Sequence, residues 1–363
     1  MSELKLAVIG AGHLGKIHAR LAKNLPHVNL VGVCDPAESA RAIIAEELQL
    51  PTFADYRPLL NQLDAAIVAA PTSLHSDICR DLLKHGIHVL VEKPITPSAD
   101  QAWQLVELAE QQNCVLQVGH VERFNPAMRC IAPEIDDVYY IEATRSSGFT
   151  FRSMDVGVVM DLMIHDLDLV LSLVRRPVID VKATGISMFG EHEDIAQTRI
   201  EFDNGCVANL TASRTSFVPQ RVMKLFTRDR FASIDMTAGK AIQIQPAESL
   251  RNRTLDVRAL TSQQQAEFRD ELFTKWLPIE EVVAEPSNAI QEEQLDFVRS
   301  IRTGVAPQVS GVDGMQAVAL AERILTQIQQ HQWGVPPHVA AGPLVRPDSL
   351  ETTPPTIPYR KAG

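Results

Sequence analysis

The sequence has few cysteines, and their spacing forms no recognisable motif. The five cysteines are scattered through 363 residues, and no pair has CxxC spacing. This pattern argues against a disulfide framework and a zinc ribbon, and it is typical of a reduced, cytoplasmic protein. The chain also lacks a run of about 18 apolar residues and a basic N-terminal segment followed by an apolar core. We therefore expect neither a membrane helix nor a secretory leader.

Positive charge is also scarce. The chain has 34 lysine and arginine residues against 45 aspartate and glutamate residues, which gives a formal net charge of -11. That charge argues against a general affinity for nucleic acid or for an anionic membrane. A local basic pocket for a small anionic molecule is still compatible with it. Because 45% of the residues are hydrophobic, the chain can bury two cores.

The first third of the chain alternates apolar strands with helices. Strands are predicted at 4–9, 29–34, 65–70, 88–91 and 115–118, and helices near 13–24, 37–48, 74–85 and 98–112. Almost wholly apolar strands are typical of a parallel sheet covered on both faces. The alternation therefore predicts an α/β fold, with a doubly wound Rossmann domain over residues 1–122.

The pattern changes in the second part of the chain. Residues 123–332 read as an α+β domain with an antiparallel or mixed sheet, in which Asp203-Asn204-Gly205 joins two strands as a hairpin. Its strands are predicted at 138–146, 178–189, 195–202, 206–213, 221–228 and 231–236, and its helices near 157–174, 288–303 and 312–330. Residues 333–363 are rich in proline and predict an extended tail.

A glycine motif, Gly10-x-Gly12-x-x-Gly15, follows the first predicted strand and opens a helix. The first glycine allows a tight turn, the second lets a pyrophosphate approach the backbone, and the third lets helix and strand pack closely. Asp35 ends the second strand, where a carboxylate would bind the ribose 2′-hydroxyl of NAD and repel the 2′-phosphate of NADP. The pattern predicts an NAD site. The alternative is a bare Rossmann-like scaffold in which Asp35 caps a helix.

Two further loops are expected at the same carboxyl edge of the sheet. One contains Pro71, Thr72 and His75, and we interpret His75 as packed or capping rather than catalytic. The other is Glu92-Lys93-Pro94, where proline biases Lys93 toward an extended backbone, so that its side chain projects from the rim beside the nicotinamide position. An ammonium there would stabilise alkoxide character on a substrate. Glu92 would support the lysine or its loop; the alternative is a surface Glu–Lys pair.

The predicted helix 157–174 carries polar residues among aliphatic ones. At about 100° per residue, Asp161, His165 and Asp168 fall within about 60° on one face, whereas Asp166 points elsewhere. Burying these groups is costly unless they pair or serve chemistry. His165 can take a proton from a hydroxyl, and Asp161 can orient the imidazole or bind the same hydroxyl. The alternatives are a structural His–Asp network and a metal site that recruits a second histidine.

Together, the three motifs resemble the Gfo/Idh/MocA dehydrogenases, a family that includes glucose–fructose oxidoreductase and inositol dehydrogenase. The resemblance extends from the N-terminus to the helix near 312–330. It implies an NAD-binding Rossmann domain and a C-terminal domain whose open-faced, mainly antiparallel sheet forms a homodimer or homotetramer. It also implies that Lys93, Asp161 and His165 occupy the catalytic positions.

The predicted site residues fall into two sets. Cofactor binding is predicted for Gly10, Gly12, His13, Leu14, Gly15, Asp35, Pro71, Thr72, His75, Glu92 and Lys93. Substrate binding is predicted for Lys93, His120, Arg123, Asn125, Asp161 and His165. No residue is predicted to bind a metal.

Two stretches, 118–126 and 161–174, are similar to a narrower group, the bacterial UDP-N-acetylglucosamine 3-dehydrogenases of lipid A biosynthesis. This resemblance implies oxidation of the C3 hydroxyl of that nucleotide sugar, with a 3-keto product that an aminotransferase consumes. Arg123, Arg145 and Arg152 lie in an interval without lysine, and guanidinium groups suit a diphosphate; pairing with nearby acidic residues is the alternative.

Other functions are compatible with the same motifs. They are an inositol or free-sugar dehydrogenase of the same family, a non-enzymatic NAD-dependent sensor, and a metal-dependent lyase or hydrolase. The sensor would lack the Lys93, Asp161 and His165 set, which this chain retains.

Overall fold

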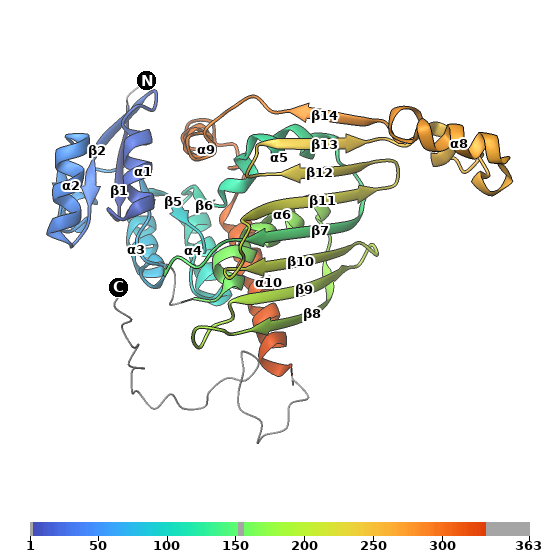
Figure 1. The fold of residues 1–363 in the computed structure, drawn as a ribbon. Coiled ribbons are helices and arrows are strands. Elements are labelled where there is room, and N and C mark those ends of the chain that lie inside the picture. Colours follow the sequence, from blue (N-terminus) through green and yellow to red (C-terminus); the bar gives the residue numbers. More distant parts are fainter. Residues whose placement is uncertain (1–2, 152–155, 332–363) are drawn as a thin grey trace, which may run out of the picture.

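The computed structural model describes residues 3–151 and 156–331, which form two joined α/β domains (Figure 1). The predicted Pro-rich tail and Arg152 lie outside the described residues. No helix in the described ranges is long and apolar enough to cross a membrane.

The first domain contains a six-stranded sheet in the order β3-β2-β1-β4-β5-β6. Every pair of neighbouring strands is parallel, which confirms the doubly wound Rossmann sheet. The strands are β1 (Leu4–Ile9), β2 (Val28–Cys34), β3 (Thr52–Phe53), β4 (Ala65–Val68), β5 (His88–Glu92) and β6 (Leu116–Gly119). Strand β3 was missed because two residues show no periodicity.

Helices cover both faces of this sheet. Helices α1 (His13–Ala22) and α2 (Glu38–Leu48) share one core with the sheet, and α3 (Thr72–Lys84) and α4 (Ala99–Gln111) share the other. Helix α9 (Ala289–Thr303) adds Phe297 and Val298 to the first core, although it follows the second domain in sequence. The C-terminal helices therefore tie the two domains together.

The second domain contains an eight-stranded sheet in the order β14-β13-β12-β11-β7-β10-β9-β8. Only β7 and β10 pair in parallel, so the mainly antiparallel prediction is confirmed. The strands are β7 (Val138–Ser146), β8 (Val178–Ile186), β9 (Ile195–Phe202), β10 (Val207–Ser213), β11 (Gln220–Thr227), β12 (Phe231–Asp235), β13 (Lys240–Ile244) and β14 (Ile279–Val283). Helices α6 (Ile164–Val174) and α10 (Gly311–Gln330) pack on one face, and no described helix covers the other (Figure 1).

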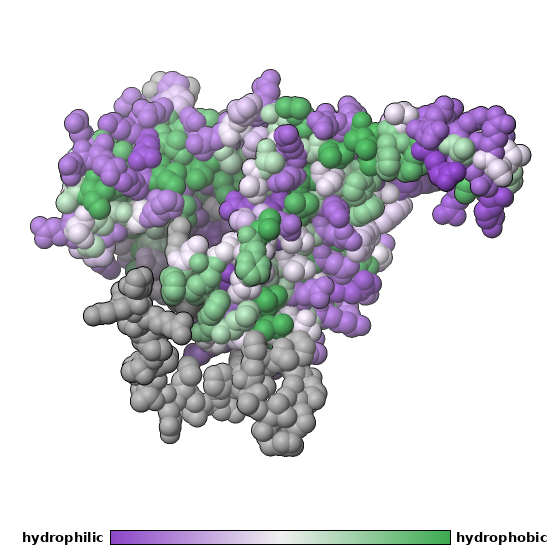
Figure 2. All heavy atoms as spheres, in the orientation of Figure 1, coloured by the Kyte–Doolittle hydropathy of each residue, from purple (hydrophilic) through white to green (hydrophobic). Residues whose placement is uncertain are grey.

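A polar segment connects β13 and β14 and projects away from the rest of the molecule (Figure 1). It contains α7 (Glu248–Arg251) and α8 (Ser262–Asp270), neither of which has a buried residue. Figure 2 shows its far end as predominantly hydrophilic. The sequence did not predict this segment, because helical periodicity depends on an apolar face that packs on a core.

Short helical elements complete the fold. They are α5 (Pro126–Ile131), the 3₁₀ turns Arg57–Leu59, Val121–Phe124, Ala132–Glu134 and Val257–Ala259, and the π turns Val159–Met163 and Leu272–Trp276. The Asn125 side chain accepts a hydrogen bond from the backbone N–H of Ala127, and Pro126 occupies the first turn of α5. This cap starts α5 just after the carboxyl edge of the Rossmann sheet.

Helix α10 lies against β6 through two glycines. A Cβ at Gly311 would lie 2.7 Å from Leu116 Cδ2, and a Cβ at Gly314 would lie 2.6 Å from Val118 Cγ2. The glycines therefore permit a close approach between the last helix and the last strand of the Rossmann sheet.

Replacing Gly314 with alanine should destabilise the protein by about 1–2 kcal/mol. Overpacking against the buried Val118 side chain costs about 1–3 kcal/mol, which exceeds the gain in helix propensity of about 1 kcal/mol. Chemical denaturation measures the change. Gln316→Ala, at an exposed position of the same helix, should have almost no effect. An unchanged free energy of unfolding for Gly314→Ala would contradict the close contact, and adding Val118→Ala should relieve the clash.

Candidate active site

The glycine loop has the geometry that a bound pyrophosphate requires. A Cβ at Gly10 would lie 2.4 Å from the Ala69 carbonyl oxygen, and a Cβ at Gly15 would lie 1.9 Å from the Gly10 carbonyl oxygen. Packing of the loop therefore requires glycine at both positions. At Gly12 a Cβ would meet nothing within 4 Å, so packing does not require this glycine. Its bare backbone faces open space at the N-terminus of α1, where a phosphate binds well.

A cavity of about 890 Å³ extends from this loop along the carboxyl edge of the sheet. Six residues predicted to bind the cofactor line it: Gly10, Gly12, His13, Leu14, Asp35 and Pro71. Thr72 and His75 lie in the adjoining first turn of α3. The carboxylate of Asp35 accepts hydrogen bonds from the backbone N–H groups of Ala11, at 2.7 Å, and Ala37, at 2.8 Å. These bonds fix the carboxylate beside the glycine loop.

Four residues that line the cavity were not predicted from the sequence. Tyr56, Arg57, Asp77 and Ile78 line it, and the first two follow the short strand β3. No motif marks these positions: Tyr56 and Arg57 reach the cavity because they follow β3 at the edge of the sheet, and Asp77 and Ile78 reach it from α3. Arg41 was also missed: its Nη1 donates to the carbonyl oxygen of Asp35 at 2.7 Å, which holds the end of β2 against α2.

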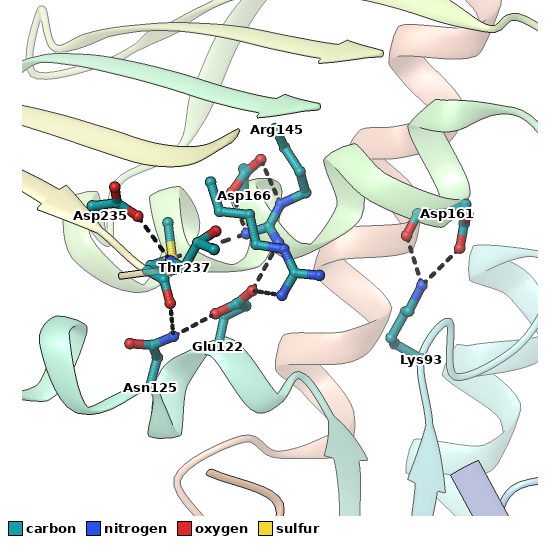
Figure 3. Close-up of polar contacts among 10 residues, drawn as sticks. Lys93, Glu122, Asn125, Arg145, Asp161, Asp166, Asp235 and Thr237 are labelled. Carbon is teal, nitrogen blue, oxygen red and sulfur yellow. Dashed lines mark hydrogen bonds and ion pairs between the residues drawn. The ribbon is translucent and has the colours of Figure 1, made fainter. Parts of the chain in front are cut away.

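Lys93 bridges the two domains at the end of β5. Its Nζ donates to the Asp161 carbonyl oxygen at 2.6 Å and to Asp161 Oδ1 at 3.1 Å (Figure 3). The lysine side chain is 15% exposed and the aspartate side chain 29% exposed, so the pair is largely shielded but still open to a ligand. The structure thus places the predicted lysine beside the predicted catalytic helix.

Glu92 supports the lysine from within the Rossmann domain. Its carboxylate accepts from His18 Nε2 at 2.8 Å and from the Lys93 backbone N–H at 3.2 Å. Gln294 of α9 holds the other ring nitrogen of His18, with 2.9 Å between Nε2 and Nδ1. Burial alone would raise the pKa of Glu92, but His18 and the Lys93 ammonium hold it below its usual value. A Cβ at Gly119 would lie 3.0 Å from Glu92 Oε2, so a glycine keeps this carboxylate in place.

His75 connects two loops at the sheet edge. Its Nδ1 lies 3.0 Å from the Pro94 carbonyl oxygen, and its Nε2 lies 2.8 Å from the Ala70 carbonyl oxygen. The ring is buried, and burial lowers its pKa. These contacts agree with a packed histidine that positions the loop after Lys93.

The predicted catalytic helix begins with a π turn, Val159–Met163, and continues as α6. A π turn adds a residue to the helical turn, so spacing of 100° per residue does not hold across it. The three residues that were expected on one face therefore have separate surroundings: Asp161 contacts Lys93, Asp168 binds Arg123, and His165 faces His120. Among the described residues no hydrogen bond joins Asp161 to His165, so of the two roles expected for Asp161, orienting the imidazole has no contact in this structure, and binding the substrate hydroxyl stays a prediction.

His165 and His120 form an edge-to-face pair with ring centroids 6.4 Å apart. His165 Nδ1 and both ring nitrogens of His120 are buried and have no hydrogen-bond partner among the described residues. Burial lowers the pKa of His165 well below its usual value, and the positive charges of Lys93 and Arg145 lower it further. Burial also lowers the pKa of His120. Both imidazoles are therefore neutral at pH 7.

The start of the π turn is fixed by a residue from the β8–β9 connection. Glu193 Oε1 accepts from the Val159 backbone N–H at 3.1 Å. A Cβ at Gly157 would lie 2.0 Å from the same oxygen, so only glycine leaves room for the carboxylate. This contact satisfies a free N–H at the helix start and positions Asp161 two residues later.

Arg145 lies beneath the site in a buried network of ion pairs (Figure 3). Its Nε and Nη2 donate to both carboxylate oxygens of Asp166, at 3.0 and 2.8 Å, and its Nη1 donates to Glu122 Oε1 at 2.7 Å. Asn125 Nδ2 donates to Glu122 Oε2 at 3.1 Å and to the Met236 carbonyl oxygen at 3.1 Å. Every nitrogen of Arg145 has a partner, so for this arginine the structure supports the alternative expected from the sequence, pairing with acidic residues such as Glu122.

Arg123 is also held by ion pairs with carboxylates. Its Nε and Nη2 donate to the two carboxylate oxygens of Asp168, at 2.8 and 2.7 Å, and Nη2 also reaches Asp313 Oδ1 at 3.2 Å. Asp168 thus anchors the helix rather than holding His165. The predicted contact between Arg123 and a substrate stays a prediction.

A metal centre has no set of ligands within the described ranges, where no group of three or more histidine, cysteine, aspartate or glutamate residues is arranged to hold an ion.

Comparison with known proteins identifies the family. The profile of an oxidoreductase family with an NAD-binding Rossmann fold matches residues 4–120, and the C-terminal alpha/beta domain of the same family matches residues 134–336. The chain belongs to the Gfo/Idh/MocA oxidoreductase family. It is an NAD-dependent oxidoreductase, and the glycine loop and Asp35 form part of its NAD-binding domain.

Individual relatives of this Gfo/Idh/MocA protein act on sugars and cyclitols. It is 38% identical over 241 residues to the UDP-N-acetylglucosamine 3-dehydrogenase of Acidithiobacillus ferrooxidans. The matched residues cover 65% of this chain and 75% of the relative. It is 32% identical over 234 residues to the NAD(+)-dependent scyllo-inositol 2-dehydrogenase of Bacillus subtilis, covering 59% of this chain and 68% of the relative. A solved structure of the Acidithiobacillus enzyme superposes with a TM-score of 0.79 at 31% identity, over 91% of this chain and 99% of the other.

Replacing Asp35 with alanine should weaken NAD binding by about tenfold, because a charge-assisted hydrogen bond contributes about 1.5–3 kcal/mol. Relative use of NADP should improve, since the repulsion of a 2′-phosphate is removed. Steady-state KM values for both cofactors test this. Glu38→Ala removes a nearby exposed carboxylate that does not line the cavity, and it should leave both values unchanged. A preference of the unmodified protein for NADP would contradict the role of Asp35.

Proposed function

We propose that this oxidoreductase uses NAD to oxidise a secondary hydroxyl of a nucleotide sugar, and specifically the C3 hydroxyl of UDP-N-acetylglucosamine. The contact of Lys93 with Asp161 beside a neutral His165, at the carboxyl end of β5, carries the proposal. The 38% identity to a UDP-N-acetylglucosamine 3-dehydrogenase supports the choice of substrate. An inositol or free sugar is the alternative within the family, and the scyllo-inositol relative supports it.

In this mechanism His165 is the general base. Within the part of the chain that the structure describes, its Nδ1 is buried without a partner, which leaves Nε2 to take the hydroxyl proton. Lys93 stabilises the negative charge that develops on the substrate oxygen. Asp161 holds the ammonium at that position through its carbonyl and carboxylate oxygens. NAD, when bound, accepts the hydride from the same carbon.

Substrate recognition involves His120 and Arg221 in this proposal. His120 has two buried ring nitrogens without a partner among the described residues, and because the whole side chain is buried, a sugar hydroxyl or acetamido group would bind them only after neighbouring side chains move. Arg221 on β11 is 57% exposed at the side chain, and its Nη1 lies 3.6 Å from Glu122 Oε1. It lines a cavity of about 640 Å³ with Asn125 and Asn288. Arg123 and Arg145 are enclosed in short ion pairs, whereas Arg221 is exposed and has only the longer contact with Glu122, so Arg221 is the arginine we assign to the diphosphate.

The proposal also includes protein partners and a cellular compartment. A 3-keto nucleotide sugar is reactive, so an aminotransferase is the class of enzyme that would consume it. The uncovered face of the second sheet, opposite α6 and α10, would form the contact of a homodimer or homotetramer. The low cysteine content favours the cytoplasm as the site of this reaction.

Lys93→Ala and His165→Ala should each lower turnover by roughly 10²–10⁴-fold, the usual contribution of a positioned acid–base group. NAD binding, followed by fluorescence titration, should stay almost unchanged. His85→Ala removes an exposed histidine and should have no effect. Near-normal turnover in both variants would contradict their catalytic roles.

The same assignment makes a prediction for pH dependence. Because the pKa of His165 is lowered below 6.5, the base is already deprotonated at pH 7. The value of kcat/KM should therefore be constant near neutral pH. It should fall only when the pH drops below the usual pKa of a histidine side chain. A midpoint of the acid limb above 6.5 would exclude the buried imidazole as the base.

UDP-N-acetylglucosamine should be oxidised much faster than free N-acetylglucosamine or myo-inositol, as measured by NADH absorbance with an aminotransferase present to remove product. Arg221→Gln should raise KM for the nucleotide sugar about tenfold or more, the scale of a lost charge-assisted bond, without changing the rate with the free sugar. Arg199→Gln, at an exposed position of β9, is the matched control. Faster oxidation of inositol would overturn the choice of substrate and leave the family unchanged.

A further inference from the structure

A second, basic cavity lies between the C-terminal end of α6 and helix α10. Its volume is about 650 Å³. Four arginines line it, Arg123, Arg175, Arg176 and Arg323, together with a single carboxylate, that of Asp313. Lys93, Asp161 and His165 are not among its lining residues, so the cavity is separate from the candidate active site.

Two of these arginines are neutralised by carboxylates. Arg123 binds Asp168 and Asp313, and Arg176 Nε donates to Asp203 Oδ1 at 2.8 Å. Their charges are therefore compensated within the fold.

The other two arginines have no carboxylate partner among the described residues. Arg175 Nε donates to the Ser172 carbonyl oxygen at 2.9 Å, and Arg323 Nη1 donates to the Val178 carbonyl oxygen at 3.3 Å. Both guanidinium groups retain further N–H donors at the cavity wall. In a chain of net charge -11, two cations without a carboxylate partner among the described residues on one concave surface favour the binding of an anion.

The backbone conformation of Arg175 favours a functional role for its side chain. Arg175 follows the last residue of α6 with φ 51°, a left-handed conformation that is strained for a residue with a Cβ. Glycine normally occupies this position. An arginine held there contributes its side chain to the cavity despite the strain.

We propose that this cavity binds a small phosphorylated molecule. The phosphate would be bound by Arg175 and Arg323, because a guanidinium group can donate two parallel hydrogen bonds to phosphate oxygens. Leu171, Met315 and Leu320 provide an apolar wall for the organic part of the ligand. Arg123 lines the same cavity and binds Asp168 three residues after His165, so an occupant lies beside the contact that anchors the catalytic helix.

Isothermal titration of the NAD-saturated protein tests the proposal. NAD occupies the glycine loop, so phosphate binding there does not contribute. Inorganic phosphate and glucose 6-phosphate are titrated separately at constant ionic strength, with potassium chloride as the balancing salt. We expect saturable binding at one site. Tighter binding of the sugar phosphate identifies an organic ligand, and equal affinity identifies free phosphate; both results support the site.

Variants connect the signal to the cavity. Arg175→Gly combined with Arg323→Gln should weaken binding by about tenfold or more, the scale of lost charge-assisted hydrogen bonds. Arg175→Gly should also keep or raise the melting temperature, because glycine relieves the left-handed backbone. Loss of binding therefore cannot be attributed to unfolding. Arg228→Gln, at an exposed turn outside the cavity, is the control and should bind as the unmodified protein does.

Two results would overturn the site. One is the absence of saturable binding of either phosphate. The other is equal affinity in the double variant and the unmodified protein, which would place the anion elsewhere.

Discussion

The contact between Lys93 and Asp161 is the interaction on which the site depends. Lys93 follows a strand of the Rossmann sheet, and Asp161 belongs to the helical segment that packs on the second sheet. Neither domain forms the constellation alone. The relative position of the domains therefore matters as much as the motifs. Helices α9 and α10 fix that position by packing against the Rossmann domain: α9 beside α1, and α10 against α4 and β6.

The same lysine also favours the neutral form of His165, the base in the proposed mechanism. A buried imidazole resists protonation because its charged form loses solvation, and a nearby ammonium adds repulsion. At His165 both effects act together, with burial the larger. In the proposed mechanism, the residue that stabilises charge on the substrate oxygen thus adds to burial in keeping the base free of its proton. A lysine held by Asp161, rather than by the histidine, is compatible with both roles.

Much of the first domain could be predicted from the sequence because local signals decide it. The apolar strands, the glycine motif and the residue before Pro94 are each read within about ten residues, and the parallel order follows from their alternation with helices. Three features were not predicted correctly because the local signal was missing or was changed. Strand β3 is too short for periodicity, the segment between β13 and β14 has no apolar face, and the π turn changes the phase of the helix.

The sequence also could not predict which polar residues pair, because the partners come from elements that are far apart in the chain. Asp166 and Asp168 are two residues apart, yet one binds Arg145 of β7 and the other binds Arg123 after β6. Each pair is buried, so removing one partner would leave an uncompensated charge. Because the two aspartates point to different elements, the helix cannot rotate about its axis without breaking one of the pairs. The orientation of His165 in the candidate site is therefore determined by two carboxylates that have no role in the proposed chemistry.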